Sequence, residues 1–401
     1  MKVLFLTLAD FNSISDWNIY TDLLREFVKH GHKVRIISPA EKRSGRNTHI
    51  IREKNSIILK LKTGNTQKTG IIEKGISTVM LEPLYVHAIR KYFAKEKFDL
   101  VLYSTPPITL CKAVEYVKKR DGAKTYLLLK DIFPQNAVDM GMLQKTGLKG
   151  LVYKYFRAKE KKLYRISDTI GCMSEANIDY VIKHNPELDN RKVEISPNST
   201  VIRDMSIGKD RKLEIRDNYE IPHDKTIFIY GGNLGKPQGI DFIVECLKKA
   251  KNESVFFVII GDGTDYPKIK IFVETEKPCN VKLMERLSKE EYDRLVGACD
   301  VGLIFLDYRF TIPNFPSRLI SYMQAKIPVL AVTDTASDVG QIIEEGKFGW
   351  WCESNNSDVF LNCIKQAVKS DLKQLGDNAF EYLADHYDVN EQVKGILSHI
   401  E

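Results

Sequence analysis

The sequence has no hydrophobic run long enough to cross a membrane. A membrane-spanning helix needs about 20 consecutive apolar residues, and polar side chains interrupt every apolar stretch well before that length. The apolar opening, residues 1–8, is followed at once by Asp10 and Asp16 without a small-residue cleavage site. We therefore interpret it as a buried first strand and not as a signal peptide.

Cysteine and histidine are sparse and scattered. Seven cysteines, an odd number, and eight histidines show neither the density of a disulfide framework nor the spacing of metal ligands. Such cysteines are typical of reduced thiols, so we expect a cytoplasmic protein without a metal site. The net charge of +7 is modest, and the basic residues lack a stacking platform, which argues against nucleic-acid binding.

Short β-branched runs alternate with segments of helical period along the whole chain, which is typical of parallel sheets with crossover helices. With 401 residues the chain exceeds one ordinary core. Two consecutive series of about six strands predict two Rossmann-like α/β domains, and a (β/α)₈ barrel is the rival fold. The predicted strands are residues 3–8, 33–39, 99–104, 125–130, 169–173 and 193–196, then 226–230, 255–260, 280–284, 300–306, 328–333 and 349–352.

These patterns predict one domain over residues 1–205 and a second over residues 206–385. A C-terminal helical segment, residues 386–401, is expected to cross back to the first domain. Ligands of two such sheets bind at the carboxyl ends of the strands, in the cleft that the domains face. We interpret residues 41–74, rich in Lys, Asn, Gly and Thr, as a mobile basic surface insertion with one strand-like piece at residues 56–61.

One turn in the second half combines features that suit a phosphate group. Residues 315–318 read Phe-Pro-Ser-Arg after one predicted strand and before another. A helix that begins at Pro316 and Ser317 presents free amides and the positive end of its dipole, and Arg318 can bind diphosphate oxygens with parallel hydrogen bonds. Taken alone, the same residues also make an ordinary helix start.

Two glycine-rich loops follow other predicted strands of the same half, residues 231–236 and 261–263. Glycines let the backbone approach a ligand closely, and Lys236 supplies a cation. Each loop alone is also an ordinary tight turn, but three such loops at the strand ends of one sheet predict a phosphate site. The predicted phosphate site comprises Gly231, Gly232, Asn233, Lys236, Gly261, Asp262, Gly263, Pro316, Ser317 and Arg318.

In the first half, Lys130 and Asp131 stand at the end of a predicted strand. An acid, a base or an anchor for sugar hydroxyls is expected at such a position, and an exposed charge pair is the alternative. Asp10 and Asp16, in the loop after the first strand, are further acceptor-side candidates. The stretch 141–165 carries eight basic residues against Glu160; it predicts contact with anionic lipid or an acceptor diphosphate, unless it is only a helix with a solvated basic face.

Four motifs, taken in order, resemble family-4 glycosyltransferases of the GT-B fold, and especially their bacterial O-antigen and capsule branch, which includes the N-acetyl-L-fucosamine transferases. The motifs are Lys-Asp-Ile-Phe-Pro-Gln-Asn-Ala-Val (130–138), Gly-Gly-Asn-Leu-Gly-Lys-Pro-Gln-Gly (231–239), Gly-Asp-Gly (261–263) and Phe-Pro-Ser-Arg-Leu (315–319). The resemblance implies a nucleotide-sugar donor, usually UDP-linked, retention of configuration and no divalent metal. It also implies that the domain over residues 206–385 binds the nucleotide sugar and that the domain over residues 1–205 binds the acceptor, which is often a sugar on polyprenyl diphosphate.

Carried over by position, the resemblance places Gly232 and Lys236 at the diphosphate and the Arg318 helix at phosphate and ribose. It places Met284 and Glu285 beside the base. The chain departs from the family at three places. The usual Glu-x7-Glu pair falls at Pro313 and Ser321, so a ribose anchor at Ser321 is a hydroxyl; the usual cations of the first phosphate loop fall at Asn233 and Gln238; and a frequent histidine falls at Lys130.

We therefore predict a retaining, metal-independent hexosyl- or hexosaminyltransferase. It is expected to move an N-acetylated hexosamine or deoxyhexosamine from a UDP-sugar to a lipid-linked saccharide in surface polysaccharide synthesis. Lys236 and Arg318 would stabilise the leaving diphosphate, while Lys130 and Asp131 orient hydroxyls. Two alternatives stay open: a sugar-nucleotide 2-epimerase of the same architecture, and a binding protein with little activity.

Overall fold

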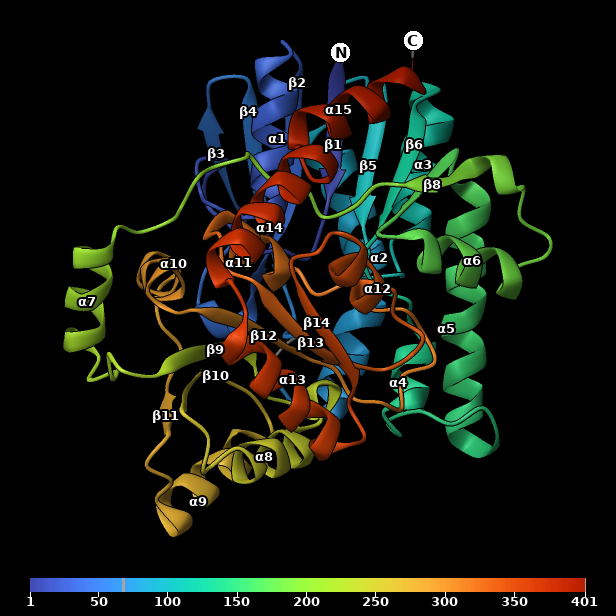
Figure 1. Cartoon of the computed structure of the whole chain (residues 1–401). Coiled ribbons are helices and arrows are strands. Elements are labelled where there is room, and N and C mark those ends of the chain that lie inside the picture. Colours follow the sequence, from blue (N-terminus) through green and yellow to red (C-terminus); the bar gives the residue numbers. More distant parts are fainter. Residues whose placement is uncertain (67–68, 401) are drawn as a thin grey trace. The chain divides into compact units, whose positions relative to one another are not determined.

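The computed structural model describes residues 1–66 and 69–400 and divides into two compact units (Figure 1). Unit 1 consists of Met1–Val201 and Asp388–Glu401, and unit 2 of Ile202–Tyr387. The chain thus leaves unit 1 four residues before the predicted domain boundary and returns to it two residues after the predicted one.

Unit 1 is an α/β unit around one sheet. Its strands are β1 (Lys2–Leu6), β2 (Lys33–Glu41), β3 (His49–Glu53), β4 (Ser56–Thr63), β5 (Leu100–Ser104), β6 (Lys124–Leu129), β7 (Thr169–Cys172) and β8 (Val193–Ile195). In the described residues the order is β3-β4-β2-β1-β5-β6-β7-β8, and neighbours run parallel except β3 and β4. Its helices are α1 (Ile19–Lys29), α2 (Ile71–Tyr92), α3 (Cys111–Asp121), α4 (Gln135–Asp139), α5 (Gly147–Ile166), α6 (Glu175–His184) and α15 (Val389–Ser398), with 3₁₀ turns η1 (Lys42–Ser44) and η2 (Asn190–Lys192).

Both faces of this sheet are buried, which explains why its strands read as continuous apolar runs. Because side chains alternate along a strand, Leu4 and Leu6 of β1 face the core under α2, α3 and α5. Val3 and Phe5 face the other core, which α1 and α15 cover.

The C-terminal helix belongs to unit 1, as predicted. α15 packs beside α1 (Figure 1), and its start is fixed to the end of the first segment because the Val389 amide donates to the carbonyl of Thr200 over 3.0 Å. Val393 and Ile396 are buried in the core against α1.

The prediction of a surface insertion over residues 41–74 is wrong. β4 pairs along its whole length with β2, and β3 pairs with β4, so both strands extend the sheet. Ile58 and Leu59 are completely buried. The misleading signal is the lysine content, and Lys60 shows why: it is 1% exposed, and its ammonium donates to Asp10, to the Ser38 hydroxyl and to the Phe11 carbonyl.

Unit 2 is a second α/β unit. Its strands are β9 (Thr226–Asn233), β10 (Val255–Asp262), β11 (Val281–Met284), β12 (Val301–Phe305), β13 (Val329–Thr333) and β14 (Gly349–Glu353), and they are parallel in the order β11-β10-β9-β12-β13-β14. Its helices are α7 (Lys209–Asn218), α8 (Ile240–Lys249), α9 (Tyr266–Glu276), α10 (Lys289–Ala298), α11 (Arg318–Gln324), α12 (Val339–Glu345), α13 (Ser357–Lys369) and α14 (Leu372–His386), with the 3₁₀ turn η3 (Lys236–Gln238).

Local sequence signals hold in unit 2. A capping box is present at the start of α10, where Ser288 and Glu291 exchange hydrogen bonds. Helix α7 lies in a strongly charged stretch of the sequence. All the strands predicted from 226 to 352 are present within a few residues.

Each sheet has a switch point, where the strand order reverses because later strands are added on the other side of the first strand. Ligands of open α/β sheets bind at the carboxyl ends of the strands at this point. In unit 1 that point lies between β1 and β5, and in unit 2 between β9 and β12. The topology therefore predicts that ligands bind at the loops after β1, β5 and β6 in unit 1 and after β9, β10 and β12 in unit 2.

Candidate active site

The two glycine loops of unit 2 pack against each other. β9 and β10 stay paired to Gly232 with Gly261 and Asn233 with Asp262. Gly232 has φ +139° and Gly261 has φ +155°, and a Cβ on Gly261 would lie 1.8 Å from the Gly232 carbonyl oxygen. Only glycine fits this close backbone approach.

Arg318, the first residue of α11, points back to this loop and not outward from the helix start. Its guanidinium carbon lies 4.3 Å from the centroid of the Tyr230 ring. A Cβ on Gly232 would approach its Nη2 to 2.9 Å. The structure thus brings Arg318 against the carboxyl end of β9, at Gly231 and Gly232.

The charge of Arg318 is not neutralised by any carboxylate in the described part of the chain, and its Nη1 is buried with no hydrogen-bond partner. Burial works against this charge, but the surrounding tyrosines outweigh it and raise the pKa of Arg318 further, so it stays a cation. A buried donor without an acceptor is costly, and an anion at the Gly232 turn would supply one.

Sequence reasoning missed the aromatic surroundings of Arg318. Tyr230 lies under the guanidinium, and Tyr292 packs so closely that a Cβ on Gly231 would lie 2.1 Å from its ring. The Tyr322 hydroxyl lies 3.0 Å from the Leu303 carbonyl oxygen, which fixes α11 on the sheet. Tyrosines at these spacings look like ordinary core residues, so no local signal identifies them.

The two positions where the resemblance expects cations bond to each other. The side-chain Nδ2 of Asn233 donates to Gln238 Oε1 over 2.7 Å, and the backbone N–H of Gly235 donates to the same oxygen over 3.3 Å. These contacts close the loop around Lys236, which is exposed at the start of η3. Lys236 is thus free to reach a ligand at the loop.

The remaining donor-side candidates differ in how close the structure places them to the loops after β9 and β10. Met284 pairs with Ile260, the residue before Gly261, so it stands at the same edge of the sheet, and Glu285 follows it on the surface. Ser317 is exposed and caps no amide, and the amides of Leu319 and Ile320 already donate to carbonyls of Pro316 and Ser317. The helix start therefore offers fewer free amides than predicted, and Arg318 is its main contribution. Ser321 lies half-buried on α11.

A further connection was not apparent from the sequence. The loop after β12 is tied to η3, because the Asp307 amide donates to the Pro237 carbonyl over 2.9 Å. The Asp307 carboxylate in turn holds Arg309 with bonds of 2.8 and 2.7 Å. The strands at the switch point of unit 2 thus share one cross-linked set of loops.

In unit 1, Lys130 and Asp131 follow β6 but form no ion pair with each other among the described residues. Lys130 Nζ donates to the carbonyls of Ser196 and Pro197 over 3.0 and 3.1 Å. Burial lowers the pKa of Lys130 to about 7. Lys130 and Asp131, predicted to stand together as a charge pair, therefore bond to different partners.

Asp131 is held by Asn136, whose side-chain Nδ2 donates to both carboxylate oxygens over 2.8 and 3.0 Å. Burial raises the pKa of Asp131 to about 6, although the Asn136 hydrogen bond opposes this rise. The Thr105 hydroxyl accepts the backbone amides of Lys130 and Asp131. A carboxylate that titrates near neutral pH is suited to proton transfer.

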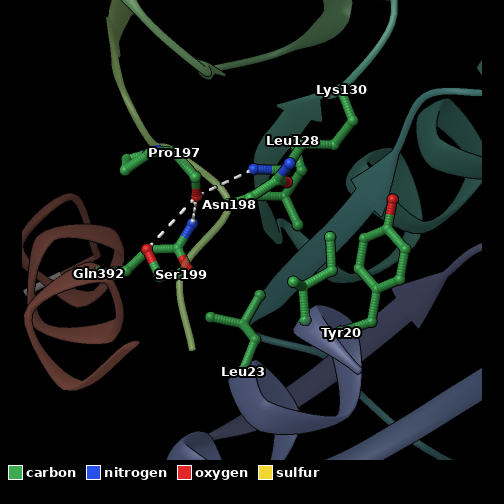
Figure 2. Close-up of a pocket in the computed structure, with 9 residues that line it drawn as sticks. Tyr20, Leu23, Leu128, Lys130, Pro197, Asn198, Ser199 and Gln392 are labelled. Atoms are coloured by element: carbon green, nitrogen blue, oxygen red, sulfur yellow. Dashed lines mark hydrogen bonds between the residues drawn. The ribbon is translucent and has the colours of Figure 1, made fainter. Parts of the chain in front are cut away.

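Lys130 lines a small pocket that no sequence motif predicted (Figure 2). The Pro197 carbonyl accepts hydrogen bonds from Lys130, from Ser199 and from Gln392 of α15. Asn198, 4% exposed, also lines the pocket, and its Oδ1 is buried without a partner in the described residues. The returning helix thus helps to position the segment that holds Lys130.

The other acceptor-side candidates have structural partners. Asp10 pairs with buried Lys60. Asp16 accepts the amides of Asn12 and Ser13 over 3.0 and 3.2 Å and so shapes its own loop.

Asp10→Asn is expected to lower the free energy of unfolding by about 2 kcal/mol, because it leaves the Lys60 ammonium buried without a counter-charge. Chemical denaturation monitored by circular dichroism measures this loss. Asp16→Asn is the matched control, since Asp16 caps an exposed loop. An unchanged stability in Asp10→Asn would show that the Phe11 carbonyl and the Ser38 hydroxyl are sufficient to stabilise the buried Lys60 ammonium.

The comparisons with known proteins agree on one class. Residues 211–382, most of unit 2, match the family described as glycosyl transferases group 1. The chain is 26% identical over 328 residues to the probable glycosyltransferase WbjE of Pseudomonas aeruginosa, covering 80% of this chain and 78% of that one. It is 21% identical over 293 residues to WcaI of Escherichia coli K12, a putative colanic acid biosynthesis glycosyl transferase, covering 68% and 71%.

Among solved structures, sucrose-phosphate synthase of Thermosynechococcus elongatus aligns with a TM-score of 0.77 at 14% identity, over 100% of this chain and 99% of that one. HepE of Anabaena in complex with UDP-glucose aligns with a TM-score of 0.70 at 15% identity, over 100% of both chains. The chain therefore has the GT-B fold of glycosyltransferases, as predicted. Most of unit 2 is similar to the glycosyl transferases group 1 family, and these relatives do not favour the 2-epimerase alternative.

Proposed function

We propose that this chain is a retaining glycosyltransferase that moves a sugar from a UDP-sugar to a lipid-linked saccharide in the synthesis of a surface polysaccharide. The observation that carries the proposal is the guanidinium of Arg318 beside Gly232 at the switch point of unit 2, because its Nη1 is buried with no hydrogen-bond partner among the described residues. The name of WcaI supports polysaccharide synthesis, and the UDP-glucose bound by HepE supports the donor class.

In the proposed reaction, the donor diphosphate lies at the Gly232 turn. Arg318 and Lys236 stabilise the charge that develops on it as the bond to the sugar breaks. Because the guanidinium is already held on the Tyr230 ring, it needs no reorganisation when that charge appears. The acceptor hydroxyl attacks on the face from which the diphosphate leaves, so no protein nucleophile is required.

The proposal includes no divalent metal. Among the described residues, no group of three or more His, Cys, Asp or Glu side chains is arranged to hold one. We expect transfer activity to be unchanged, within about twofold, after treatment with EDTA and assay without added metal. Loss of activity that Mg²⁺ or Mn²⁺ restores would contradict this part of the proposal. In that case the cations Arg318 and Lys236 would share their role with the metal.

On the acceptor side, Asp131 acts as the group that takes the proton from the attacking hydroxyl or orients it. Its pKa of about 6 and its fixed hydrogen bonds to Asn136 suit this task. The donor sugar we propose is an N-acetylated hexosamine or deoxyhexosamine. NMR of the product tests retention, and an inverted anomeric centre would contradict this part of the proposal.

We also propose that the enzyme works in the cytoplasm at the inner face of the cell membrane, because its acceptor is lipid-linked. The basic stretch 141–165 is the proposed contact. No helix in the described residues is long and apolar enough to cross a bilayer, so such a contact is peripheral. All seven cysteines, each in the described part of the chain, are free thiols.

Thermal unfolding with UDP is the direct test of the donor site. A ligand at 100 times its dissociation constant stabilises the folded state by about 2.7 kcal/mol, which corresponds to a rise of several degrees in Tm for a domain of this size. UMP, which lacks the second phosphate, is expected to give a smaller rise. No response to any nucleoside diphosphate would contradict the proposal, and epimer formation from a UDP-sugar without acceptor would favour the alternative.

A further inference from the structure

Two helices of unit 1 present apolar side chains to solvent. On α2 these are Ile76, Val79 and Met80, and on α5 Leu148, Leu151 and Val152. The exposed fractions of Leu148, Leu151 and Ile76 are 86%, 64% and 63%. We call this surface the α2–α5 face.

The spacing makes each set a single face of its helix. Positions i, i+3 and i+4 lie together on a helix, and both sets follow that spacing. The core face of α2 is apolar as well, since Leu81 and Tyr85 are completely buried. A helix that is apolar on its outer side too is typical of burial against a further surface.

The two helices are fixed to one another. Lys159 of α5 pairs with Glu82 of α2 over 2.7 Å, and both side chains are largely buried. The Lys159 ammonium lies 5.8 Å from the centroid of the exposed Tyr155 ring. The apolar stripes of α2 and α5 therefore lie on two helices that this ion pair connects.

The positive charge of the stretch 141–165 divides into two sets. Arg157, Lys159, Lys161 and Lys162 are each paired with a glutamate. Lys145, Lys149, Lys154 and Arg165 are exposed and form no ion pair within the described residues. The three lysines of this second set lie beside the exposed apolar side chains of α5, and this combination is complementary to an anionic bilayer.

We propose that the α2–α5 face docks on an anionic lipid bilayer, with apolar side chains of α2 and of the first half of α5 inserted among the acyl chains. The free lysines of α5 contact lipid phosphates at the headgroups. The inference rests on the proposed function only for its choice of a membrane as partner. It adds α2, which carries no basic stretch, as half of the contact.

Co-sedimentation of the full chain with vesicles tests this surface. The vesicles are phosphatidylcholine alone, or phosphatidylcholine with an equal part of phosphatidylglycerol. The variants are Ile76→Gln with Met80→Gln on α2, Leu148→Gln with Leu151→Gln on α5, and Lys149→Gln with Lys154→Gln. Ile271→Gln with Val359→Gln is the matched control, because both side chains are exposed apolar residues of unit 2, at 59% and 42%.

We expect the wild type and the control to bind the anionic vesicles equally. Each apolar pair should weaken binding at least tenfold, since each buried methylene contributes about fourfold. Removing one lysine costs about fivefold, so the lysine pair should lose about 25-fold, on anionic vesicles only. Wild-type binding by the α2 pair would overturn the inference, as would failure of the wild type to bind.

Two further measurements separate the outcomes. If sedimentation velocity shows a dimer that the same apolar variants dissociate, the face is an interface between copies of the chain and the inference is overturned. The rise of Tm with UDP reports unit 2 and should be unchanged in all variants. Vesicle binding without a rise of Tm would support the α2–α5 face as a membrane contact and contradict the proposed function. A rise of Tm without vesicle binding would support the donor site and overturn the inference about this face.

Discussion

Arg318→Ala is expected to lower kcat/KM for sugar transfer by about 10²- to 10³-fold. The guanidinium is held on Tyr230 at 4.3 Å and beneath Gly232, so it is fixed where charge develops on the leaving diphosphate. Steady-state assays with a UDP-sugar and a lipid-linked acceptor measure the loss. The rise of Tm with UDP should shrink as well, because the same cation contacts the ground-state diphosphate.

Two variants make this result interpretable. Arg318→Lys keeps a charge but loses the planar fork that stacks on an aromatic ring and binds two oxygens at once, so it should recover only part of the activity. Arg294→Ala removes an exposed arginine that pairs with Glu290 on α10, and its activity should equal that of the wild type. Near-normal transfer by Arg318→Ala would refute the assigned role. A loss of folding in both alanine variants would instead point to a general effect on unit 2.

Much of the fold was predictable because it depends on local patterns. Fully buried parallel strands produce short apolar runs, and crossover helices produce helical periods between them. Ser288 with Glu291 marks the start of α10 through contacts within a single turn. Such signals need no knowledge of residues far away in the chain.

What failed depends on long-range contacts. Lys60 suggested a solvated segment, yet it is buried because Asp10, fifty residues earlier, supplies its counter-charge. The same contact gives Asp10 a structural role, although its place after β1 made it a candidate for acceptor binding. A charged residue inside a strand is interpretable only when its partner is known.

The candidate site shows the same division. The glycines of the two loops were predictable, since close backbone packing leaves a glycine pattern in the sequence. The orientation of Arg318 was not, because it is set by tyrosines that come from β9, α10 and α11. The bond between Asn233 and Gln238 likewise became apparent only once the loop was closed.

Asp131→Asn is expected to lower kcat/KM by about 10²-fold or more and to change its dependence on pH. Burial raises the pKa of Asp131 to about 6 and lowers that of Lys130 to about 7. If the ionised carboxylate accepts a proton, the wild-type rate rises as pH increases through about 6. If the Lys130 ammonium is also needed, the rate falls again above about 7. The wild type should therefore show a narrow bell, and Asp131→Asn should lose its acidic limb.

Stability distinguishes this role from a structural one. The folded-state pKa of Asp131 lies above its unfolded value, so its contribution to stability is present at low pH and is lost as pH rises through about 6. At pH 8 the ionised carboxylate is a cost that asparagine removes, and Asp131→Asn should unfold at an equal or higher temperature than the wild type. Asp10→Asn should behave in the opposite way, with a lower Tm and an unchanged bell. An Asp131→Asn variant that loses stability at pH 8 and keeps both limbs would show that Asp131 only supports the fold.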